Sequence, residues 1–226
     1  MAIDTKAREQ AILDAAAKLI IQHGYDKTTI GDVAEAVGLN RALVYAYFKS
    51  KDDLLAVLIA REMRKYGELW MEHIETDPKG GAVASIYRSI SYALKHTPFM
   101  AAIVTRDEGT FGKYLRKPGN IFEGMQTPSM TRDLLQAAGV IRQGVNIPAM
   151  AYIMDIIANG LVEQRNVSTM DIVPPYDELM ETLAEIFDRM LAPEDGGNLA
   201  AGKDILRQLA AASRAHFEQV EKQSQG

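Results

Sequence analysis

The sequence contains no cysteine and a single tryptophan among its 226 residues. The lack of cysteine excludes disulfide bonds, a thiolate nucleophile, and any zinc or iron–sulfur site built on cysteine ligands. It is typical of proteins in a reducing compartment, and we expect this protein to be cytoplasmic. Small secreted scaffolds that depend on disulfide bonds are therefore excluded.

The sequence also lacks the uninterrupted apolar run of about 20 residues that a membrane-spanning helix requires. Its first residues, MAIDTKAREQ, do not have the basic and then apolar pattern of a signal peptide. We therefore expect a soluble protein that is not exported and has no membrane partner.

Positive charge is not in excess, because 25 Lys and Arg residues stand against 30 Asp and Glu residues and the net charge is −5. No long-range positive field draws the whole molecule toward nucleic acid, so any DNA contact must be local. The charge is unevenly distributed, since residues 1–66 carry +1 and residues 67–226 carry −6. The small N-terminal part is therefore the less acidic one.

Motifs for catalysis and metal binding are missing as well. The four histidines have no His-Glu-x-x-His or other close ligand spacing, so we expect no metal site. Gly139 and Gly144 have the spacing of a phosphate-binding loop, but Val145 and Asn146 follow where that loop needs Lys and Ser or Thr. No Gly-x-Ser-x-Gly elbow is present. We therefore expect no catalytic residues, no cofactor and no enzymatic activity.

Apolar residues recur at helical spacing almost throughout, which predicts an all-α fold. Gly and Pro clusters such as Asp77-Pro78-Lys79-Gly80-Gly81 separate the expected helices. A first helix ends before Gly24, and the others are expected at about 29–37, 41–48, 51–76, 82–96, 98–106, 128–138, 148–165, 175–191 and 198–222.

Two short helices joined by a glycine turn are expected at about residues 29–48. Thr29 and Asp32 have the spacing of a capping box at the start of the first short helix. Gly38 permits a left-handed turn, and Asn40 is a favourable N-cap for the second short helix. A helix, a glycine-containing turn and a second helix form the helix-turn-helix layout.

The second short helix has an unusual outward face. Val44 and Phe48 form its inward side, and the residues that remain outward are Arg41, Ala42, Leu43, Tyr45 and Tyr47. An arginine fork can read guanine or clamp a phosphate, and a small alanine lets the backbone approach a base edge. The alternative for the tyrosines is packing in the core with hydrated hydroxyl groups.

Lys51 is expected in the first turn of the long helix, because Ser50 and Asp53 have the spacing of a cap. Its positive charge would meet the positive end of the helix dipole there, which structure alone does not favour. A bound DNA phosphate would favour both the charge and the free amides of the helix start. Lys49 could add to this contact, although a solvated lysine is the simpler interpretation.

Taken together, these residues resemble the DNA-binding domain of the TetR family of bacterial transcriptional regulators. The match covers about residues 6–60 and is most specific at Thr29-Ile30, Val33-Ala34, Ala36-Val37-Gly38-Leu39, Val44-Tyr45-Ala46-Tyr47-Phe48 and Ser50-Lys51-Asp52-Asp53-Leu54. The resemblance implies an all-helical homodimer whose three-helix N-terminal domain binds a palindromic operator. It also implies a C-terminal domain that dimerises and holds a small effector, which releases the DNA.

The resemblance also implies roles by position. The implied contacts are a phosphate contact by Thr29, major-groove contacts by Asn40, Arg41, Ala42 and Leu43, and contacts to the DNA backbone by Tyr45, Tyr47 and Lys51. Leu43 stands where many relatives have Thr or Ser, so contact with a thymine methyl group replaces a polar contact. Gly31 has no side chain where some relatives place a base-reading residue. The operator sequence therefore cannot be inferred from the operator of a relative.

We expect two domains: a helix-turn-helix DNA-binding domain at residues 1–50 and a helical effector-binding and dimerisation domain at residues 51–226. Nine of the eleven methionines lie beyond residue 66, and methionine suits pockets that accept varied shapes. We therefore expect an apolar or aromatic effector, although core packing is the alternative for each residue. The candidate effector-binding residues are Trp70, Tyr87, Tyr92, Met100, Phe111, Tyr114, Met125, Met154 and Asp155.

Asp155 differs from the rest of this set because it interrupts an apolar run. Its carboxylate could orient a ligand, pair across a dimer interface or face solvent. The expected helices at about 148–165 and 175–191 have broad apolar faces, and two such helices from each protomer can form a four-helix dimer interface. The helix at about 198–222 has balanced charge, so we expect it to dock on the body or on the partner subunit.

The sequence thus predicts a ligand-responsive transcriptional regulator, a repressor that binds a palindromic operator as a homodimer. The alternative is a helical small-molecule-binding protein or enzyme without operator function. The constellation of Arg41, Tyr47 and Lys51 favours the regulator, because an enzyme has no need of that arrangement.

Overall fold

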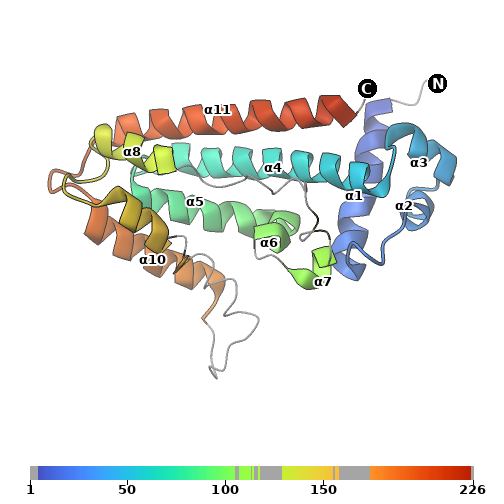
Figure 1. The fold of residues 1–226 in the computed structure, drawn as a ribbon, viewed down its shortest axis with the longest axis horizontal. Helices are drawn as coiled ribbons and strands as arrows, with labels where there is room; N and C mark the ends of the chain where they lie inside the picture. Colours follow the sequence, from blue (N-terminus) through green and yellow to red (C-terminus); the bar gives the residue numbers. More distant parts are fainter. Residues whose placement is uncertain are drawn as a thin grey trace. The chain divides into compact units, whose positions relative to one another are not determined.

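The computed structural model describes residues 5–104, 107–112, 114, 117, 129–154, 156–157 and 174–224. Every regular element in these residues is a helix, which confirms the all-α prediction. The helices are α1 (Thr5–His23), α2 (Ile30–Ala36), α3 (Arg41–Tyr47), α4 (Lys51–Thr76), α5 (Val83–His96), α6 (Pro98–Val104), α7 (Glu108–Phe111), α8 (Ser129–Ala137), α10 (Tyr176–Leu191) and α11 (Leu199–Ser224) (Figure 1).

Part of the expected helix at 148–165 can be compared with the structure. Residues 147–154 and 156–157 are helical, and residues 158–165 lie outside the described residues. Met125 and Asp155 also lie outside them. The short helix α7 is an addition that the sequence pattern did not predict, because four residues cannot establish a helical period.

Packing divides the chain into two units. The first contains residues 1–64, 98–125 and 215–226, and the second contains residues 65–97 and 126–214. This division differs from the expected boundary at residue 50, because the start of α4 packs with the N-terminal helices. Arg61 of α4, for example, donates hydrogen bonds to Asp14 and to the backbone carbonyl of Gln10 on α1. The assignment of separate functions to residues 1–50 and 51–226 stays a prediction.

The core of the first unit is built by α1, α2, α3 and the first turns of α4. Its buried side chains include Ile12, Leu13, Ala16, Ile20, Ile30, Val33, Ala34, Val44, Phe48, Leu54, Leu55 and Leu58. A helix of seven residues such as α2 is not stable alone, and α2 packs against both α1 and α3. The helix α1 also contacts α6 and α7. The short helices are thus held in place by the rest of this unit.

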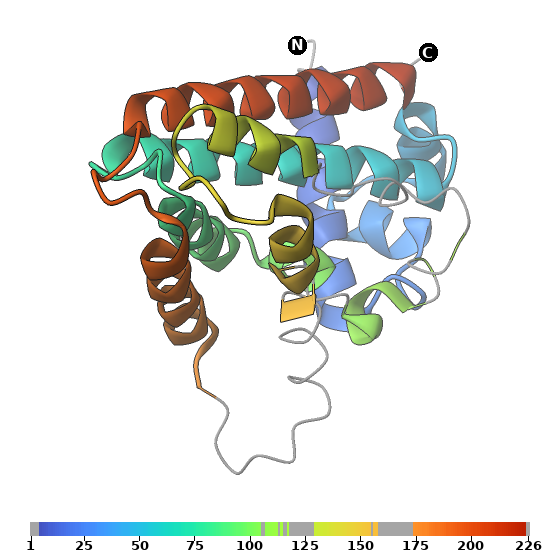
Figure 2. The same ribbon diagram turned by 60° about the vertical axis from the view of Figure 1, so that its left-hand side comes forward.

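The second unit has two apolar clusters. One lies between α4, α5 and α11 and contains Trp70, Ile74, Ala93 and Leu206. The other includes Val83 of α5, Leu135 of α8 and Phe187 of α10. The helices α5 and α10 pack against each other, as Figure 2 also shows.

Ion pairs reinforce the packing of the second unit. Arg88 of α5 donates to Glu181 of α10 at 2.7–2.9 Å, and Arg207 of α11 donates to Glu75 of α4 at 2.5 and 2.8 Å. Residues 199–214 of α11 therefore dock on this unit, in line with the expectation for the last helix. Among the described residues, no helix is both long enough and apolar enough to cross a membrane.

Candidate nucleic-acid interface

The start of α2 is closed by the predicted capping box. The Thr29 hydroxyl oxygen accepts a hydrogen bond from the Asp32 backbone N–H at 3.2 Å, and Asp32 accepts one from the Thr29 backbone N–H at 2.8 Å. The Thr29 hydroxyl also donates to the Asp32 carboxylate at 2.8 Å. These bonds, with the backbone bond first, lower the pKa of Asp32. A phosphate contact by Thr29 would therefore compete with Asp32 for the hydroxyl proton.

The turn between α2 and α3 also follows the sequence pattern. Gly38 has a φ of +66°, which a residue with a side chain rarely adopts, and its neighbour Leu39 donates a hydrogen bond to the carbonyl of Ala34 at 2.8 Å. Asn40 caps α3, because its side-chain oxygen accepts a hydrogen bond from the Leu43 backbone N–H at 2.8 Å. The amide NH₂ group of Asn40 is not used by this cap.

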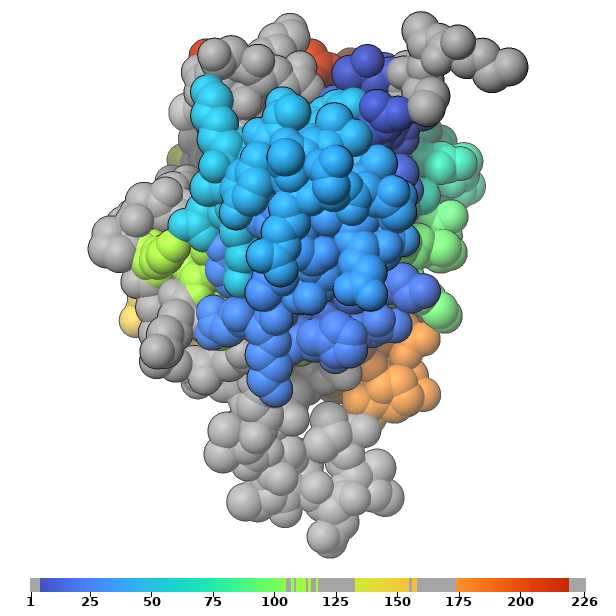
Figure 3. Space-filling view, turned by 90° about the vertical axis from the view of Figure 1, so that its right-hand side faces the viewer, coloured from blue at the N-terminus to red at the C-terminus, as the bar shows by residue number. Residues whose placement is uncertain are grey.

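In α3 the two expected inward residues and three of the five expected outward residues lie as the sequence predicts. Val44 and Phe48 are buried, Arg41, Ala42 and Tyr45 are exposed, and Leu43 and Tyr47 are half-buried. Core packing is excluded for Tyr45, which is 52% exposed. The blue N-terminal residues form a broad surface in Figure 3. The helix thus presents a guanidinium group, a small residue and a phenol to the outside.

Arg41 lies across the first turn of α2. A Cβ atom placed on Gly31 would come within 2.4 Å of Nη2 and 2.6 Å of Nε of Arg41. The missing side chain at position 31 therefore leaves room for the guanidinium group, a relation that sequence reasoning missed. The charge of Arg41 contributes, after the Thr29 hydrogen bonds, to the lowered pKa of Asp32.

Lys51 begins α4, as its sequence position predicts. Ser50 accepts a hydrogen bond from the Asp53 backbone N–H at 3.0 Å, and Asp53 accepts one from the Lys49 backbone N–H at 2.8 Å. The Lys51 ammonium group lies 4.0 Å from the centroid of the Tyr25 ring and donates to the carbonyl of Asp26 at 3.5 Å. Partial burial is the main reason that the pKa of Lys51 is lowered. Lys51 is thus held in a defined place beside the start of α4.

Three further residues gather around Lys51 that sequence reasoning did not single out. The Tyr25 hydroxyl and the Lys117 ammonium group both donate hydrogen bonds to the Asp52 carboxylate. Lys117 is 65 positions away from Asp52 in the chain, so no local spacing could connect the two. Only the fold brings this second lysine to the start of α4.

The candidate effector-binding residues are spread over several places. Trp70 belongs to the cluster between α4, α5 and α11, whereas Met154 belongs to the cluster around Phe187. Tyr87 stacks on Phe187 with a centroid distance of 4.8 Å, and Tyr92 lies against the rings of His73 and His96. The candidates Met100, Phe111 and Tyr114 belong to the first packing unit. Their role in effector binding stays a prediction.

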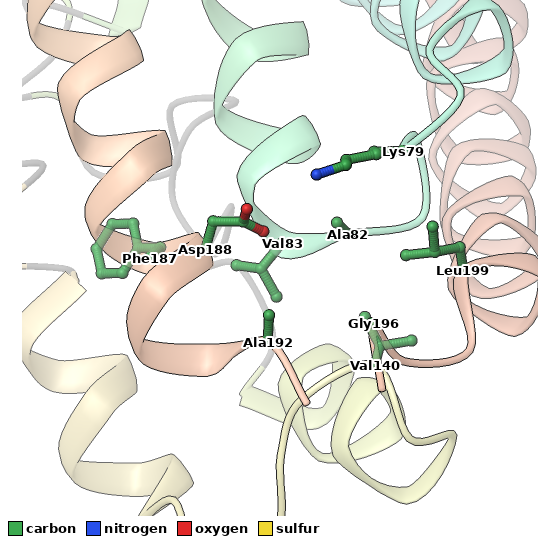
Figure 4. Close-up of a pocket in the computed structure, with 9 residues that line it drawn as sticks. All are labelled: Lys79, Ala82, Val83, Val140, Phe187, Asp188, Ala192, Gly196 and Leu199. Atoms are coloured by element: carbon green, nitrogen blue, oxygen red, sulfur yellow. The ribbon is translucent and has the colours of Figure 1, made fainter. Parts of the chain in front are cut away.

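A small cavity of about 170 Å³ lies in the second unit (Figure 4). Lys79 and Asp188 supply its charged groups, and Val83, Val140 and Phe187 supply apolar surface. None of the candidate effector-binding residues lines it, and it is smaller than the roughly 300–1,000 Å³ of typical ligand pockets. Among the described residues, no three His, Asp or Glu side chains gather closely enough to hold a metal ion.

Residues 12–58 match the family described as bacterial regulatory proteins, tetR family. The HTH-type transcriptional regulator AcrR of Shigella flexneri is 33% identical over 87 residues, which are 38% of this chain and 40% of that protein. The probable acrEF/envCD operon repressor of Escherichia coli (strain K12) is 25% identical over 202 residues, which are 83% of this chain and 91% of that protein. This chain thus matches less than half of the first relative and nearly all of the second.

Solved structures share the fold. The fatty acid degradation regulator FadR from Bacillus halodurans has a TM-score of 0.55 at 17% identity and covers 79% of this chain and 93% of its own. At this identity the likeness concerns the fold alone. It confirms the prediction of an N-terminal helix-turn-helix domain followed by a larger helical domain.

Proposed function

Because residues 12–58 match the family of bacterial regulatory proteins called tetR, we propose that this chain represses transcription by binding a palindromic operator as a homodimer. A small apolar or aromatic effector releases it from the DNA. The observation that carries this proposal is the geometry of α3, a capped short helix that presents Arg41, Ala42 and Tyr45 outward next to Lys51. Such a helix has the size and the side chains to enter a major groove.

The proposed DNA contacts follow from exposure and chemistry. Asn40, Arg41, Ala42 and Leu43 face the bases, where the Arg41 fork matches the two acceptors of guanine and Leu43 contacts a thymine methyl group. The proposed contacts to the DNA backbone are those of Thr29, Tyr45, Tyr47 and Lys51. Among the described residues, no carboxylate is within ion-pair distance of the Arg41 guanidinium group, so its fork is available to the DNA.

Exposed apolar side chains support a homodimer through the two helices near 148–165 and 175–191. Tyr152, Ile153 and Ile156 are exposed in the first of these regions, and Ile186 and Met190 are exposed on α10. Large apolar side chains grouped on a surface mark interaction sites. A symmetric interface between these helices would cover them. In the proposed complex with DNA, the two α3 helices lie about 34–36 Å, or a multiple of one DNA turn, apart.

A buried donor in the second unit supports an effector that is apolar but not a pure hydrocarbon. The indole N–H of Trp70 is buried among apolar neighbours and has no hydrogen-bond partner among the described residues. An unsatisfied buried donor costs about 1–3 kcal/mol, which an acceptor on a ligand would offset. The proposed effector is therefore an apolar molecule with a carbonyl or ether oxygen.

Release of the operator requires that the effector bind a non-DNA state more tightly than the DNA-binding state. In the proposed mechanism the effector binds between the helices of residues 67–170. It favours a state in which the separation of the two α3 helices no longer fits successive major grooves.

The test of this function is selection of binding sites from a random duplex DNA pool by the purified protein. A palindromic consensus among the recovered sequences supports sequence recognition by a dimer. If nothing is enriched, also after unfolding and refolding to remove any bound ligand, the operator function is wrong. The alternative would then be a helical small-molecule-binding protein.

Alanine substitutions of Arg41 and of Lys51 are expected to weaken DNA binding in different ways. Arg41→Ala should weaken binding to the selected consensus by about 1–3 kcal/mol and relax the preference at one base position, because it removes a base contact. Lys51→Ala should weaken binding to all sequences alike and lower the salt dependence, because it removes a phosphate contact. Fluorescence anisotropy with consensus and scrambled duplexes at two salt concentrations measures both effects. Equal affinity of both variants and the wild type would contradict these roles.

Trp70 reports on effector binding directly, because it is the only tryptophan in the chain. We expect carbonyl-bearing compounds to change its emission and to bind more tightly than hydrocarbons of the same size. The expected advantage is about twofold to tenfold, the size of one net hydrogen bond. Methyl decanoate and dodecane, which have main chains of equal length, form a suitable pair. The Trp70→Phe variant should bind the ester and the hydrocarbon equally well, as measured by release of the operator. If this variant still binds the ester more tightly, the indole is excluded as the hydrogen-bond donor.

A further inference from the structure

Lys51 is followed directly in the sequence by two carboxylates, Asp52 and Asp53. Acidic residues are favourable in the first turn of a helix, because they meet the positive end of its dipole. The same carboxylates are unfavourable next to a lysine that must bind a phosphate, since an ion pair with Lys51 would cancel its charge. The structure resolves this conflict for each of them in a different way.

Asp53 is used by the cap of α4. Its backbone N–H donates to Ser50, and its carboxylate accepts the backbone N–H of Lys49 at 2.8 Å. Asp52 lies outside this cap, and its carboxylate accepts hydrogen bonds from the Tyr25 hydroxyl and from the Lys117 ammonium group. The bond from Lys117 and then that from Tyr25 lower the pKa of Asp52, so it remains ionised and engaged by both groups.

Tyr25 contacts both Asp52 and Lys51. Its hydroxyl group binds Asp52, and the face of its ring lies under the Lys51 ammonium group at 4.0 Å. A cation over an aromatic face has no negative partner that compensates its charge, unlike a cation in an ion pair. Among the described residues, no carboxylate lies within ion-pair distance of Lys51, although Asp52 is its neighbour in the chain.

Tyr25 is itself held by the part of the chain around residue 110, within the same packing unit. Its backbone N–H donates to the carbonyl of Thr110 at 2.6 Å, and its ring meets the ring of Tyr114 edge to face at 5.3 Å. Gly24, with φ +84°, permits this close approach, because a Cβ there would lie 2.6 Å from the carbonyl oxygen of Gly109. Light green atoms of this stretch lie beside the blue N-terminal surface in Figure 3.

We propose that Tyr25 and Lys117 are positioning residues for the phosphate contact of Lys51, because together they bind Asp52 and prevent it from pairing with Lys51. The inference rests on the proposed DNA-binding function. It assigns Lys117, far outside the helix-turn-helix motif, an indirect part in operator affinity. Removal of Lys117 frees Asp52 to neutralise the phosphate-binding charge.

The first test is the affinity of the full-length Lys117→Met variant for the selected operator across a series of salt concentrations. We expect a loss of about threefold to fivefold at low salt and a salt slope lower by about one, the values for one phosphate contact. The matched control is Lys95→Met, which removes an exposed lysine of the second unit and should leave both values near those of the wild type. Equal behaviour of the two variants would overturn the proposal.

A double-mutant cycle then separates an indirect role of Lys117 from direct contact with DNA. Its side chain is 53% exposed, so a direct phosphate contact is the competing explanation. If Lys117 acts through Asp52, Lys117→Met should have no further effect in an Asp52→Asn background, and Asp52→Asn alone should bind at least as tightly as the wild type. An undiminished loss in the Asp52→Asn background means direct contact and overturns the proposal.

Two more variants test whether Tyr25 and Lys117 act through Lys51. Tyr25→Phe keeps the ring but removes the hydroxyl group, so it should weaken operator binding about twofold and reduce the salt slope. Lys117→Arg keeps the positive charge and should bind the operator as the wild type does. In a Lys51→Ala background, Lys117→Met should change nothing. If Lys117→Met still weakens operator binding in the Lys51→Ala background, the positioning role is contradicted. If the wild-type protein selects no operator, the proposed function is wrong as well.

Discussion

Replacing Phe48 with alanine is expected to lower the free energy of unfolding by about 3–5 kcal/mol. Phe48 follows the last residue of α3, is 2% exposed and donates its backbone N–H to the carbonyl of Val44 at 3.0 Å. Its ring is buried in the small core of the first unit, so truncation leaves a cavity there. Urea unfolding followed by circular dichroism measures this loss.

The matched control for Phe48 is Tyr45→Ala on the exposed side of α3. This change should alter the free energy of unfolding by less than about 0.5 kcal/mol, because the ring packs against little of the core. It should still weaken operator binding, since Tyr45 is a proposed contact to the DNA backbone. Equal destabilisation by the two variants would contradict the inward and outward assignment of this helix.

Introducing a charge into the proposed dimer interface is expected to have the largest effect on operator binding. Ile153→Asp combined with Ile186→Asp buries two carboxylates per protomer if the interface forms as proposed, at a cost that no partner offsets. We expect a monomer by analytical ultracentrifugation at concentrations where the wild type is a dimer. Operator affinity should fall by about 10²-fold or more, because the two half-sites are no longer bound by one linked molecule.

Ile21→Asp is the control for this pair of substitutions. Ile21 is an exposed isoleucine of α1, outside both proposed dimer helices, so the variant should remain a dimer. A wild-type protein that sediments as a monomer, or a double variant that remains a dimer, would show that the dimer is built from other surfaces.

Local chemistry made the helix-turn-helix motif predictable from sequence. The caps at Thr29 and Asn40, the glycine turn at Gly38 and the buried face of Val44 and Phe48 all depend on residues within four positions of each other. Hydrogen bonds at such short separations form in the same way in most folds. The expected start of α4 at Lys51 is correct for the same reason.

Contacts between distant residues could not be predicted from local sequence patterns. Methionine and aromatic residues predicted an apolar interior, but their pattern could not say that Trp70 and Met154 belong to different clusters. The boundary expected at residue 50 followed the end of the motif, whereas α4 runs on and shares its buried residues with both packing units. The pairing of Asp52 with Lys117 has no local signal, since it depends on how the chain returns to the start of α4.

The absence of a side chain at Gly31 has a consequence for how operator preference can diverge. The Arg41 guanidinium group lies where a Cβ of residue 31 would be, so any other residue there forces this flexible group to move. A mutation of the glycine codon would therefore redirect the arginine while every residue proposed to contact the bases stays unchanged. Paralogues produced by gene duplication could separate their target sites in one such step, with the sequence of α3 identical in both.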